Sequence, residues 1–462
     1  MRGLITTSVA VAVLSGACLT PVEQVHDTAV TAAPEPKVAS IDRGMKEENP
    51  GTIAVPVAGP AELAALINVT LNDLDDFWLF AYPDVYGATY ETIAQFDPYD
   101  FSAGDRPQCG DEPLDAETAK GNAFYCPIDD TISWDNEELF PALYEQFGDF
   151  AVALVLAHEW GHAIQKRGEV TGATILTELQ ADCFAGAWVG SLRERGSSLA
   201  PFSDDLDTAA AGFLIFRDPV GIDAGSRGAH GNAFDRLGHF SDGLRQGATH
   251  CAELEAVGVD ATEAGFRGDA EFLSGGNLPP EEVVPTLSTT LDVYWSGVGE
   301  RFGFDWKAFD EIFAIDSIED LSCDVSKATS GAVWCQTNNT VHLEIDAVIA
   351  PLYNQFGDFG PGLILAQVWA LKGVEELGLA TEGTGAVLRA DCLVGDWAGQ
   401  MVDGIRLDPN DETSLISLSP GDLDEAIQSL LFLGGGDGLS AFERVEAMRV
   451  GFFGGTSACL SG

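Results

Sequence analysis

Basic residues are scarce in this chain. Of 462 residues only 23 are Lys or Arg, against 73 Asp or Glu, and the formal net charge at pH 7 is −50. Nucleic acids and anionic lipid headgroups are bound through Lys and Arg contacts to phosphate, so neither is an expected partner. So large an acidic excess resists aggregation but repels itself. It has two open interpretations, adaptation to a salty medium and the ordinary acidic surface of a secreted protein.

Several motifs are also missing. Beyond the N-terminal segment, no apolar stretch is long enough to span a bilayer without a charge or a break. We find no nucleophilic Ser or Cys motif, no phosphate-binding glycine loop and no CxxC, so a cysteine metal site is weakly supported. Apolar residues still make up 46% of the chain, which argues against overall disorder. The length allows two or three domains with sizeable cores.

One motif that the chain does contain points to chemistry. Residues 158–162 read HEWGH and follow an apolar run at 150–156, which predicts a buried helix. His158 and His162 then share a helix face and can bind one metal ion from the same side. Glu159 lies one position round the helix and can reach a water molecule on that metal. This is the ligand pair and general base of a zinc hydrolase.

A second predicted helix supplies the remaining parts of such a site. It begins near Thr177 and carries Glu178 and Asp182, four residues apart on one face. A catalytic zinc ion takes three protein ligands and keeps one position open, so Glu178 is the candidate third ligand. Asp182 is the candidate partner for the far nitrogen of a ligand imidazole.

Together these motifs resemble those of the bacterial putative neutral zinc metallopeptidases. The resemblance covers about residues 60–255 and rests on NAFYCPID at 122–129, HEWGH at 158–162, ELQADCFAGAW at 178–188, and a closing segment with Ala229-His230-Gly231, Arg236, Gly243, Gly247 and Cys251. It implies a zincin-type fold and a gluzincin-like site with two His and one Glu, but no particular substrate. Trp160 and Ser133-Trp134 depart from the residues expected there, which leaves the pocket shape open.

The N-terminus predicts export. Arg2, a short apolar core at 4–14 and small residues at 15–17 form a signal peptide ending before Cys18. Residues 14–18 also resemble a lipoprotein cleavage box, although the leucine lies one position early. Lipid attachment at Cys18, hence membrane attachment, and ordinary cleavage after Ala17 are the two alternatives. The protein is then a cell-envelope lipoprotein or is secreted.

An internal repeat runs through the chain. LYEQFGDF at 143–150 recurs as LYNQFGDF 209 positions later, and the same offset carries LQADC at 179–183 onto LRADC at 388–392. Near the end, Arg236, Gly243, Gly247 and Cys251 recur 208 positions later as Arg444, Gly451, Gly455 and Cys459. The chain therefore reads as one peptidase-like unit written twice.

The second copy lacks the chemistry. The positions of His158, Glu159, His162 and Glu178 hold Gln367, Val368, Leu371 and Val387. Val and Leu cannot bind zinc and suit a packed core, so we expect a degenerate, metal-free copy in which Asp391 has no imidazole to orient. It serves either as a structural partner of the first copy or as a surface that binds substrate.

The cysteines follow the repeat. There are nine, and eight remain if Cys18 carries lipid, an even number that suits disulfides in an oxidising compartment. Eight cysteines allow 105 connectivities. Pairing within each copy predicts four bridges, Cys109–Cys126, Cys183–Cys251, Cys323–Cys335 and Cys392–Cys459.

These observations predict a mainly helical α+β protein with two tandem zincin-like metallopeptidase units, the second without metal ligands. The predicted parts are a signal peptide (1–17), a flexible tether (18–58), a zinc metallopeptidase domain (59–255), a linker (256–284) and the degenerate repeat (285–462).

The function expected is zinc-dependent hydrolysis of peptide bonds in a protein or peptide substrate. His158, His162 and Glu178 hold Zn²⁺, and Glu159 is the general base. His230 is the candidate donor to the oxyanion, with a structural loop histidine as the alternative. The rival function is a non-catalytic envelope scaffold or binding protein. The intact Glu159 argues against it, because a structural zinc site needs no general base. The sequence indicates neither the substrate nor the oligomeric state.

Overall fold

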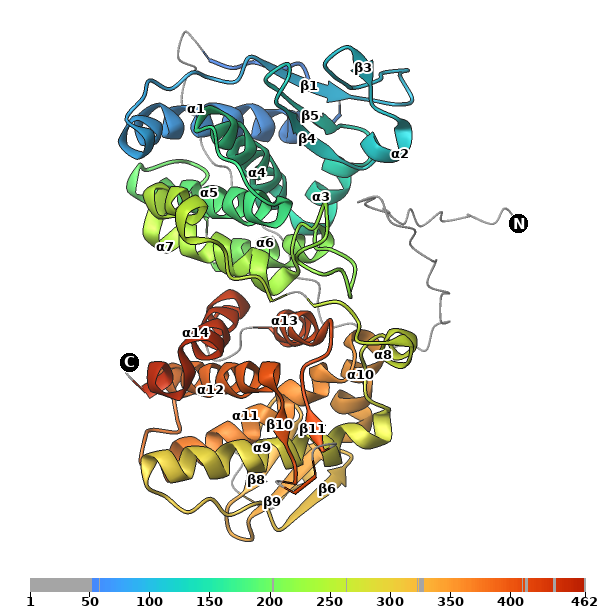
Figure 1. Ribbon diagram of the computed structural model, residues 1–462, viewed down its shortest axis with the longest axis vertical. Coiled ribbons are helices and arrows are strands. Elements are labelled where there is room, and N and C mark those ends of the chain that lie inside the picture. Colours follow the sequence, from blue (N-terminus) through green and yellow to red (C-terminus); the bar gives the residue numbers. More distant parts are fainter. Residues whose placement is uncertain are drawn as a thin grey trace, which may run out of the picture. The chain divides into compact units, whose positions relative to one another are not determined.

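The chain folds into two compact units (Figure 1). The computed structural model describes residues 52–57, 59–201, 203–262, 264–321, 323, 328–408, 410–411, 414–434 and 438–460. The predicted signal peptide, Cys18 and most of the predicted tether lie outside these residues. Among the residues described, no helix has both the length and the apolar character needed to cross a bilayer.

The two units do not follow the two halves of the sequence. The first contains the chain up to Val170, Cys183–Pro201 and Gly243–Ala252. The second contains Thr171–Asp182, Phe202–Asp242 and the chain from Glu253 onward. A stretch that the sequence assigned to the metallopeptidase domain is thus part of the unit formed mainly by the C-terminal half.

The first unit combines helices with a small mixed sheet. Its helices are α1 (Ala61–Tyr86), α2 (Ala116–Ala119), α3 (Leu139–Phe147), α4 (Asp149–Arg167) and the larger part of α5 (Thr174–Glu194). Its strands are β1 (Gln95–Tyr99), β2 (Gln108–Cys109), β3 (Glu112–Pro113), β4 (Ala123–Cys126) and β5 (Thr131–Asp135). The sheet order is β1-β5-β4, with β1 parallel and β4 antiparallel to β5.

Helix α4 is buried on most of its surface because apolar residues occupy nearly every side of it. Trp160 is fully buried in it, and the Trp160 Nε1–H donates to the Tyr90 hydroxyl at 3.2 Å. That hydroxyl in turn donates to Asp75 on α1 at 2.9 Å. A buried indole needs such a partner. Trp160, where the motif departs from expectation, therefore anchors α4 to α1.

The end of the predicted tether belongs to the first unit. The side-chain amide of Asn68 on α1 pairs with the backbone N–H and C=O of Val55, at 2.7 and 3.1 Å. One turn further, Asn72 pairs with both backbone groups of Ile53, each at 2.8 Å. The two Asn side chains hold residues 52–57 much as a neighbouring strand would.

The second unit also combines helices with a small mixed sheet and has more helices. Its helices are α6 (Ser203–Ile215), the start of α7 (Ala233–Val257), α8 (Asp269–Ser274), α9 (Pro280–Phe302), α10 (Ala350–Phe356), α11 (Phe359–Glu376), α12 (Thr384–Asp403), α13 (Asp422–Leu433) and α14 (Ala441–Leu460), with short turns η1 (Ile318–Asp320) and η3 (Ile345–Ile349). Its strands are β6 (Glu311–Ile315), β7 (Ala328–Thr329), β8 (Ala332–Cys335), β9 (Thr340–Glu344), β10 (Ile405–Arg406) and β11 (Leu415–Ile416).

The sheet of the second unit has the order β6-β9-β8-β7, and its β6 is parallel and its β8 antiparallel to β9. This matches the order β1-β5-β4 of the first unit. The closing helices match as well, because α7 breaks at Gly247 (φ 80°) and α14 at Gly455 (φ 67°). Both breaks lie in the left-handed region that favours glycine.

Glycines allow close helix packing in each half, and Gly243 and Gly451 are a matching pair of them. A Cβ on Gly243 would lie 1.8 Å from the Cys183 carbonyl oxygen, and a Cβ on Gly451 would lie 1.7 Å from that of Cys392. Both glycines therefore allow the closing helix to touch the backbone of the helix that bears the cysteine. The disulfides Cys183–Cys251 and Cys392–Cys459 link the same helix pairs.

All four predicted disulfides are present. Besides these two, the structure contains Cys109–Cys126 and Cys323–Cys335. The pairing deduced from the repeat is confirmed.

Two helices in the second unit are capped reciprocally. The Asp207 carboxylate, on α6, accepts hydrogen bonds from the first backbone amides of α14, at Ala441 (3.0 Å) and Phe442 (2.8 Å). The Asp424 carboxylate, on α13, accepts from the first amides of α7, at 2.9 and 3.3 Å. Carboxylates at helix N-termini satisfy unpaired amides and complement the helix dipole. Each half of the sequence therefore caps the closing helix of the other.

Candidate metal centre

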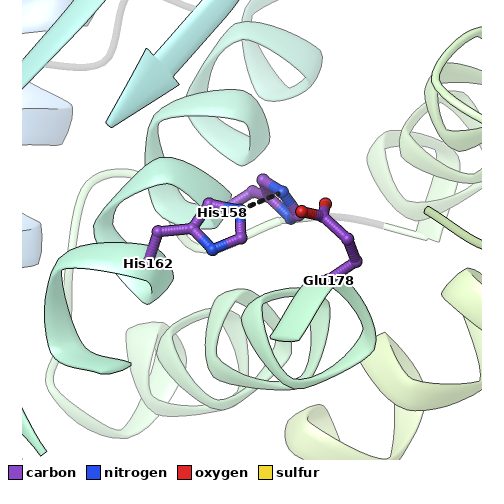
Figure 2. A group of neighbouring side chains, drawn as sticks. All are labelled: His158, His162 and Glu178. Carbon is purple, nitrogen blue, oxygen red and sulfur yellow. Dashed lines mark hydrogen bonds between the residues drawn. The ribbon is translucent and has the colours of Figure 1, made fainter. Parts of the chain in front are cut away.

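Three predicted ligands come together in the structure (Figure 2). His158 and His162 lie one turn apart on α4, and Glu178 lies near the start of α5. The two Nε2 atoms are 3.1 Å apart. One ligand atom from each of the three side chains lies within 4.8 Å of the others. All three side chains are partly exposed, so a substrate can reach them.

The donor set fits zinc. Two nitrogen ligands of a tetrahedral ion at Zn–N distances of about 2.0–2.1 Å stand about 3.3 Å apart. The separation of the two imidazole nitrogens, 3.1 Å, is close to that value. Two His with one Glu is also a ligand set of catalytic zinc sites, which leave a fourth position for water or substrate. The assignment of the three residues as zinc ligands stays a prediction that this geometry supports.

The ring of His162 has a second partner within its own helix. Its Nδ1 lies 2.9 Å from Oε1 of Gln165, which is buried. An amide oxygen only accepts, so the proton resides on Nδ1 and the lone pair on Nε2, the atom that faces His158. Sequence analysis missed Gln165, although its spacing three residues after His162 places it on the same face.

Glu159, the candidate general base, is almost buried, with 7% of its surface exposed. Its negative charge faces the Tyr99 hydroxyl, whose pKa is raised above its ordinary value by burial first, and then by the charges of Asp135 and Glu159. Tyr99 itself donates to backbone carbonyls, including that of Asn122 at 2.7 Å. The carboxylate thus lies in a poorly solvated setting.

Asp182 has a partner that the sequence did not suggest. Its two carboxylate oxygens accept from Nε and an Nη of Arg236, at 2.8 and 2.9 Å. Both residues are buried. This bidentate pair joins α5 to α7 four residues beyond Glu178. The predicted bond from a ligand imidazole to Asp182 stays a prediction.

The same arrangement recurs in the C-terminal half. Arg444 donates to both oxygens of Asp391, at 2.7 and 3.0 Å. The Gln367 side-chain amide donates to Asp391 at 2.8 Å. Gln367 occupies the position of His158 in the sequence repeat. Its amide therefore bonds to Asp391, for which the sequence predicted no imidazole partner. Val368 and Leu371 are buried as expected.

His230, the candidate oxyanion donor, lies in the loop before α7. Its Nδ1 is 3.1 Å from Oδ1 of Asp218, and Oδ2 of the same carboxylate accepts from the backbone amides of His230 and Gly231. The imidazole is 37% exposed and Asp218 is buried. Asp218 therefore fixes the orientation of the ring through Nδ1, and it does not contact Nε2. Sequence analysis missed Asp218, which belongs to none of the motifs. The role of His230 stays a prediction.

Comparison with known proteins finds similarity to one family over part of the chain and to relatives that are uncharacterized. An uncharacterized protein of Mycobacterium tuberculosis is 32% identical over 152 residues, which are 27% of this chain and 52% of the relative. The match in Mycobacterium bovis has the same values. An uncharacterized protein of Escherichia coli is 36% identical over 92 residues, 16% of this chain and 32% of the relative. The chain thus spans about half or less of the length of these relatives. No solved structure matches.

The family match agrees with the motifs and with the geometry around His158 and His162. Residues 40–253 match the family described as putative neutral zinc metallopeptidase, and the resemblance inferred from the sequence is confirmed.

Proposed function

We propose that this protein is a zinc-dependent peptidase. The observation that carries the proposal is the convergence of His158, His162 and Glu178 beside the nearly buried Glu159. A zinc ion bound there would lower the pKa of a water ligand toward neutrality and polarise a substrate carbonyl. The substrate class is a protein or peptide.

The residues of this chain then have separate tasks. Glu159 takes the proton of the attacking water and passes it to the leaving amine. Gln165 holds His162 in the tautomer whose Nε2 can bind a metal. Asp218 accepts from Nδ1–H of His230 and orients the ring, and the imidazolium form of His230, which has a second N–H on Nε2, is our candidate for a donor to the oxyanion.

We further propose that the C-terminal half is a degenerate second copy that binds no zinc. The shared sheet order, the matching helix breaks and the pair formed by Asp391 and Arg444 support this reading. The reciprocal caps favour a structural role for it over a separate substrate-binding surface. The four disulfides support export to an oxidising compartment, either as a lipoprotein attached at Cys18 or in secreted form.

The test compares single variants of the mature full chain on a peptide library, with and without chelator. Glu159→Gln should keep its zinc and lose at least about a hundredfold in cleavage rate, since general-base catalysis contributes about 10²–10⁴-fold. His162→Ala should lose zinc as well. Glu145→Gln, an exposed substitution of the same kind on α3, should change neither.

Two outcomes would reject the proposal. A Glu159→Gln variant with wild-type turnover would remove the general-base assignment. A wild type that binds zinc but cleaves no peptide in the library would instead favour a non-catalytic scaffold.

A further inference from the structure

A second group of potential metal ligands lies in the second unit and contains no histidine. Asp358 immediately precedes α11, and Asp422 and Glu425 lie in the first turn of α13. One carboxylate oxygen from each lies within 4.8 Å of the others. All three residues are buried, with exposed fractions of 4%, 5% and 6%. Three carboxylates have therefore been removed from water at one point.

None of the described basic side chains forms an ion pair that would neutralise them. Among the described residues, no ion pair reaches any of the three carboxylates. The charge of Arg267 lowers the pKa of Asp422 from a distance. The guanidinium of Arg267 itself donates hydrogen bonds to Glu271, to Ser417 and to the Leu418 carbonyl. Buried carboxylates without a cation repel one another, and burying each charge costs several kcal/mol by general estimates.

Backbone amides fix one oxygen of each carboxylate. Leu278 N–H donates to Asp358 Oδ2 (3.0 Å), Ser419 N–H to Asp422 Oδ2 (2.8 Å) and Phe359 N–H to Glu425 Oε2 (2.9 Å). The Oδ1 atoms of Asp358 and Asp422 are buried and have no hydrogen-bond partner. Buried polar atoms are rarely left unpaired, so we expect these two oxygens to bind a ligand.

A fourth oxygen stands beside the cluster. Asn277 Oδ1 accepts from the Asp358 backbone N–H at 2.7 Å, and a carbonyl oxygen retains a second lone pair. A Cβ on Gly357 would lie 2.1 Å from Glu425 Oε1 and 2.3 Å from Asn277 Oδ1. Only a glycine at that position, which has φ +117°, allows both oxygens to come so close.

We propose that Asp358, Asp422, Glu425 and Asn277 form a calcium site. Four oxygen donors and no thiol or imidazole indicate a hard cation rather than zinc. Mg²⁺ gives up its water ligands reluctantly and is seldom held by protein ligands alone, whereas Ca²⁺ accepts a flexible set of protein oxygens. Carboxylates as deeply buried as these therefore favour Ca²⁺.

The ion would join three segments of the second unit: the turn after α8, the start of α11 and the start of α13. Helix α13 also carries Asp424, which caps α7. Calcium therefore stabilises the unit that holds α14 and the start of α7. The inference is independent of the proposed peptidase activity, because these residues and the zinc-site residues do not overlap.

The test is calorimetric titration of the zinc-saturated, mature full chain with CaCl₂ at constant ionic strength, together with thermal melts. We expect one calcium ion per chain with a Kd at or below about 1 mM, the weak end of the range for extracellular calcium modules. Calcium at a hundred times its Kd should raise the folded-to-unfolded ratio of the second unit about a hundredfold. Mg²⁺ should bind at least about tenfold more weakly.

Three variants, Asp358→Asn, Asp422→Asn and Glu425→Gln, sharpen the test. Each should weaken calcium binding at least about tenfold and yet melt higher than the wild type without calcium, because a buried charge has been removed. Glu281→Gln, an exposed change of the same kind on α9, should leave both measurements unchanged. Zinc content should stay constant throughout.

Three results would overturn the proposal. If the wild type binds no calcium at about 10 mM CaCl₂ while the three variants still melt higher, the three carboxylates share protons and do not bind a metal ion. Equal calcium binding by all three variants would place the ion elsewhere. Equal affinity for Mg²⁺ and Ca²⁺ would indicate attraction by the acidic surface alone.

Discussion

Asp182 and Asp391 are buried carboxylates whose charge is balanced by one arginine each. In the first half the pair lies four residues beyond Glu178, and in the second half it lies where Gln367 stands at the position of His158 in the sequence repeat. The pair therefore has a structural task, joining two helices, that does not depend on zinc. A buried, bidentate pair of this kind is costly to break from one side, because the remaining charge has no partner.

Replacing Arg236 should measure that cost. Arg236→Met leaves Asp182 buried and unpaired, and the free energy of unfolding should fall by about 3–5 kcal/mol. Adding Asp182→Asn should restore part of the loss. Chemical denaturation of both variants checks this, with the exposed Arg227→Met as the control. A single variant as stable as the wild type would show that Asp182 is balanced by another group.

Asp235, near the start of α7, has an unusual protonation state. Burial raises the pKa of its carboxyl from 3.8 to about 7, the charge of Asp424 adds to the shift, and hydrogen bonds from Thr262 and the charge of Arg449 oppose it. The folded protein therefore keeps this proton up to about pH 7, whereas the unfolded chain releases it near pH 4. Its contribution to stability is present below pH 4 and is lost as the pH rises toward 7.

The change from pH 5.5 to pH 8 should therefore lower the melting temperature of the wild type more than that of Asp235→Asn, in which this group cannot titrate. Other ionisable groups are common to both proteins and cancel in the comparison. Asp260→Asn, an exposed substitution, should follow the wild type. Parallel pH profiles for wild type and Asp235→Asn would contradict the assignment.

At the scale of helices, much was predictable because it depends on local spacing. HEWGH places two imidazoles one turn apart on any helix, and cysteines at matching places in a repeat pair alike. Gly247 and Gly455 break their helices at matching positions. What could not be predicted depends on contacts between distant segments. Asp207 meets residue 441 and Asp424 meets residue 233. Asp358, Asp422 and Glu425 form no spaced motif either.

Removal of the reciprocal caps should destabilise the second unit. Asp207→Ala and Asp424→Ala should each lower the free energy of unfolding by about 0.5–2 kcal/mol, the usual worth of a helix cap. Asp424→Ala should cost more, because Asp424 is buried and also pairs with Arg217 at 3.0 Å. Glu300→Ala, an exposed substitution on α9, is the control for denaturant melts. Two neutral cap variants would show that water replaces the carboxylates without cost.

At the scale of the whole molecule, the C-terminal half completes the fold of the N-terminal half. The ring of Phe234 on α7 packs against Phe452 and Phe453 of α14, at 5.0 and 6.1 Å, and Phe240 packs against Phe442 at 6.1 Å. These aromatic contacts and the caps all lie within the second unit, which explains why its boundary does not follow the repeat.

A chain ending at Glu255 should therefore fold poorly but keep its metal. It loses α13 and α14, so Phe234 and Phe240 lose their aromatic partners, and it should melt earlier and aggregate more readily than the full chain. Metal analysis should find one zinc per chain in both proteins, since the three candidate ligands remain. Two zinc ions in the full chain would refute the degenerate second copy. An equally stable short chain would refute its structural role.

The reciprocal caps also affect folding during synthesis. The amides at the start of α7 can be capped only after Asp424 has been synthesised, 191 residues after Ala233. Likewise, Asp207 can act as a cap only after Ala441 has been synthesised, 234 residues later. Contacts so distant in sequence slow folding and prolong the exposure of unfinished surfaces. The N-terminal half, which holds the candidate zinc ligands, thus leaves the ribosome long before its last helix can be completed. A nascent chain interrupted between the two halves would be a target for chaperones and proteases rather than an early-released enzyme.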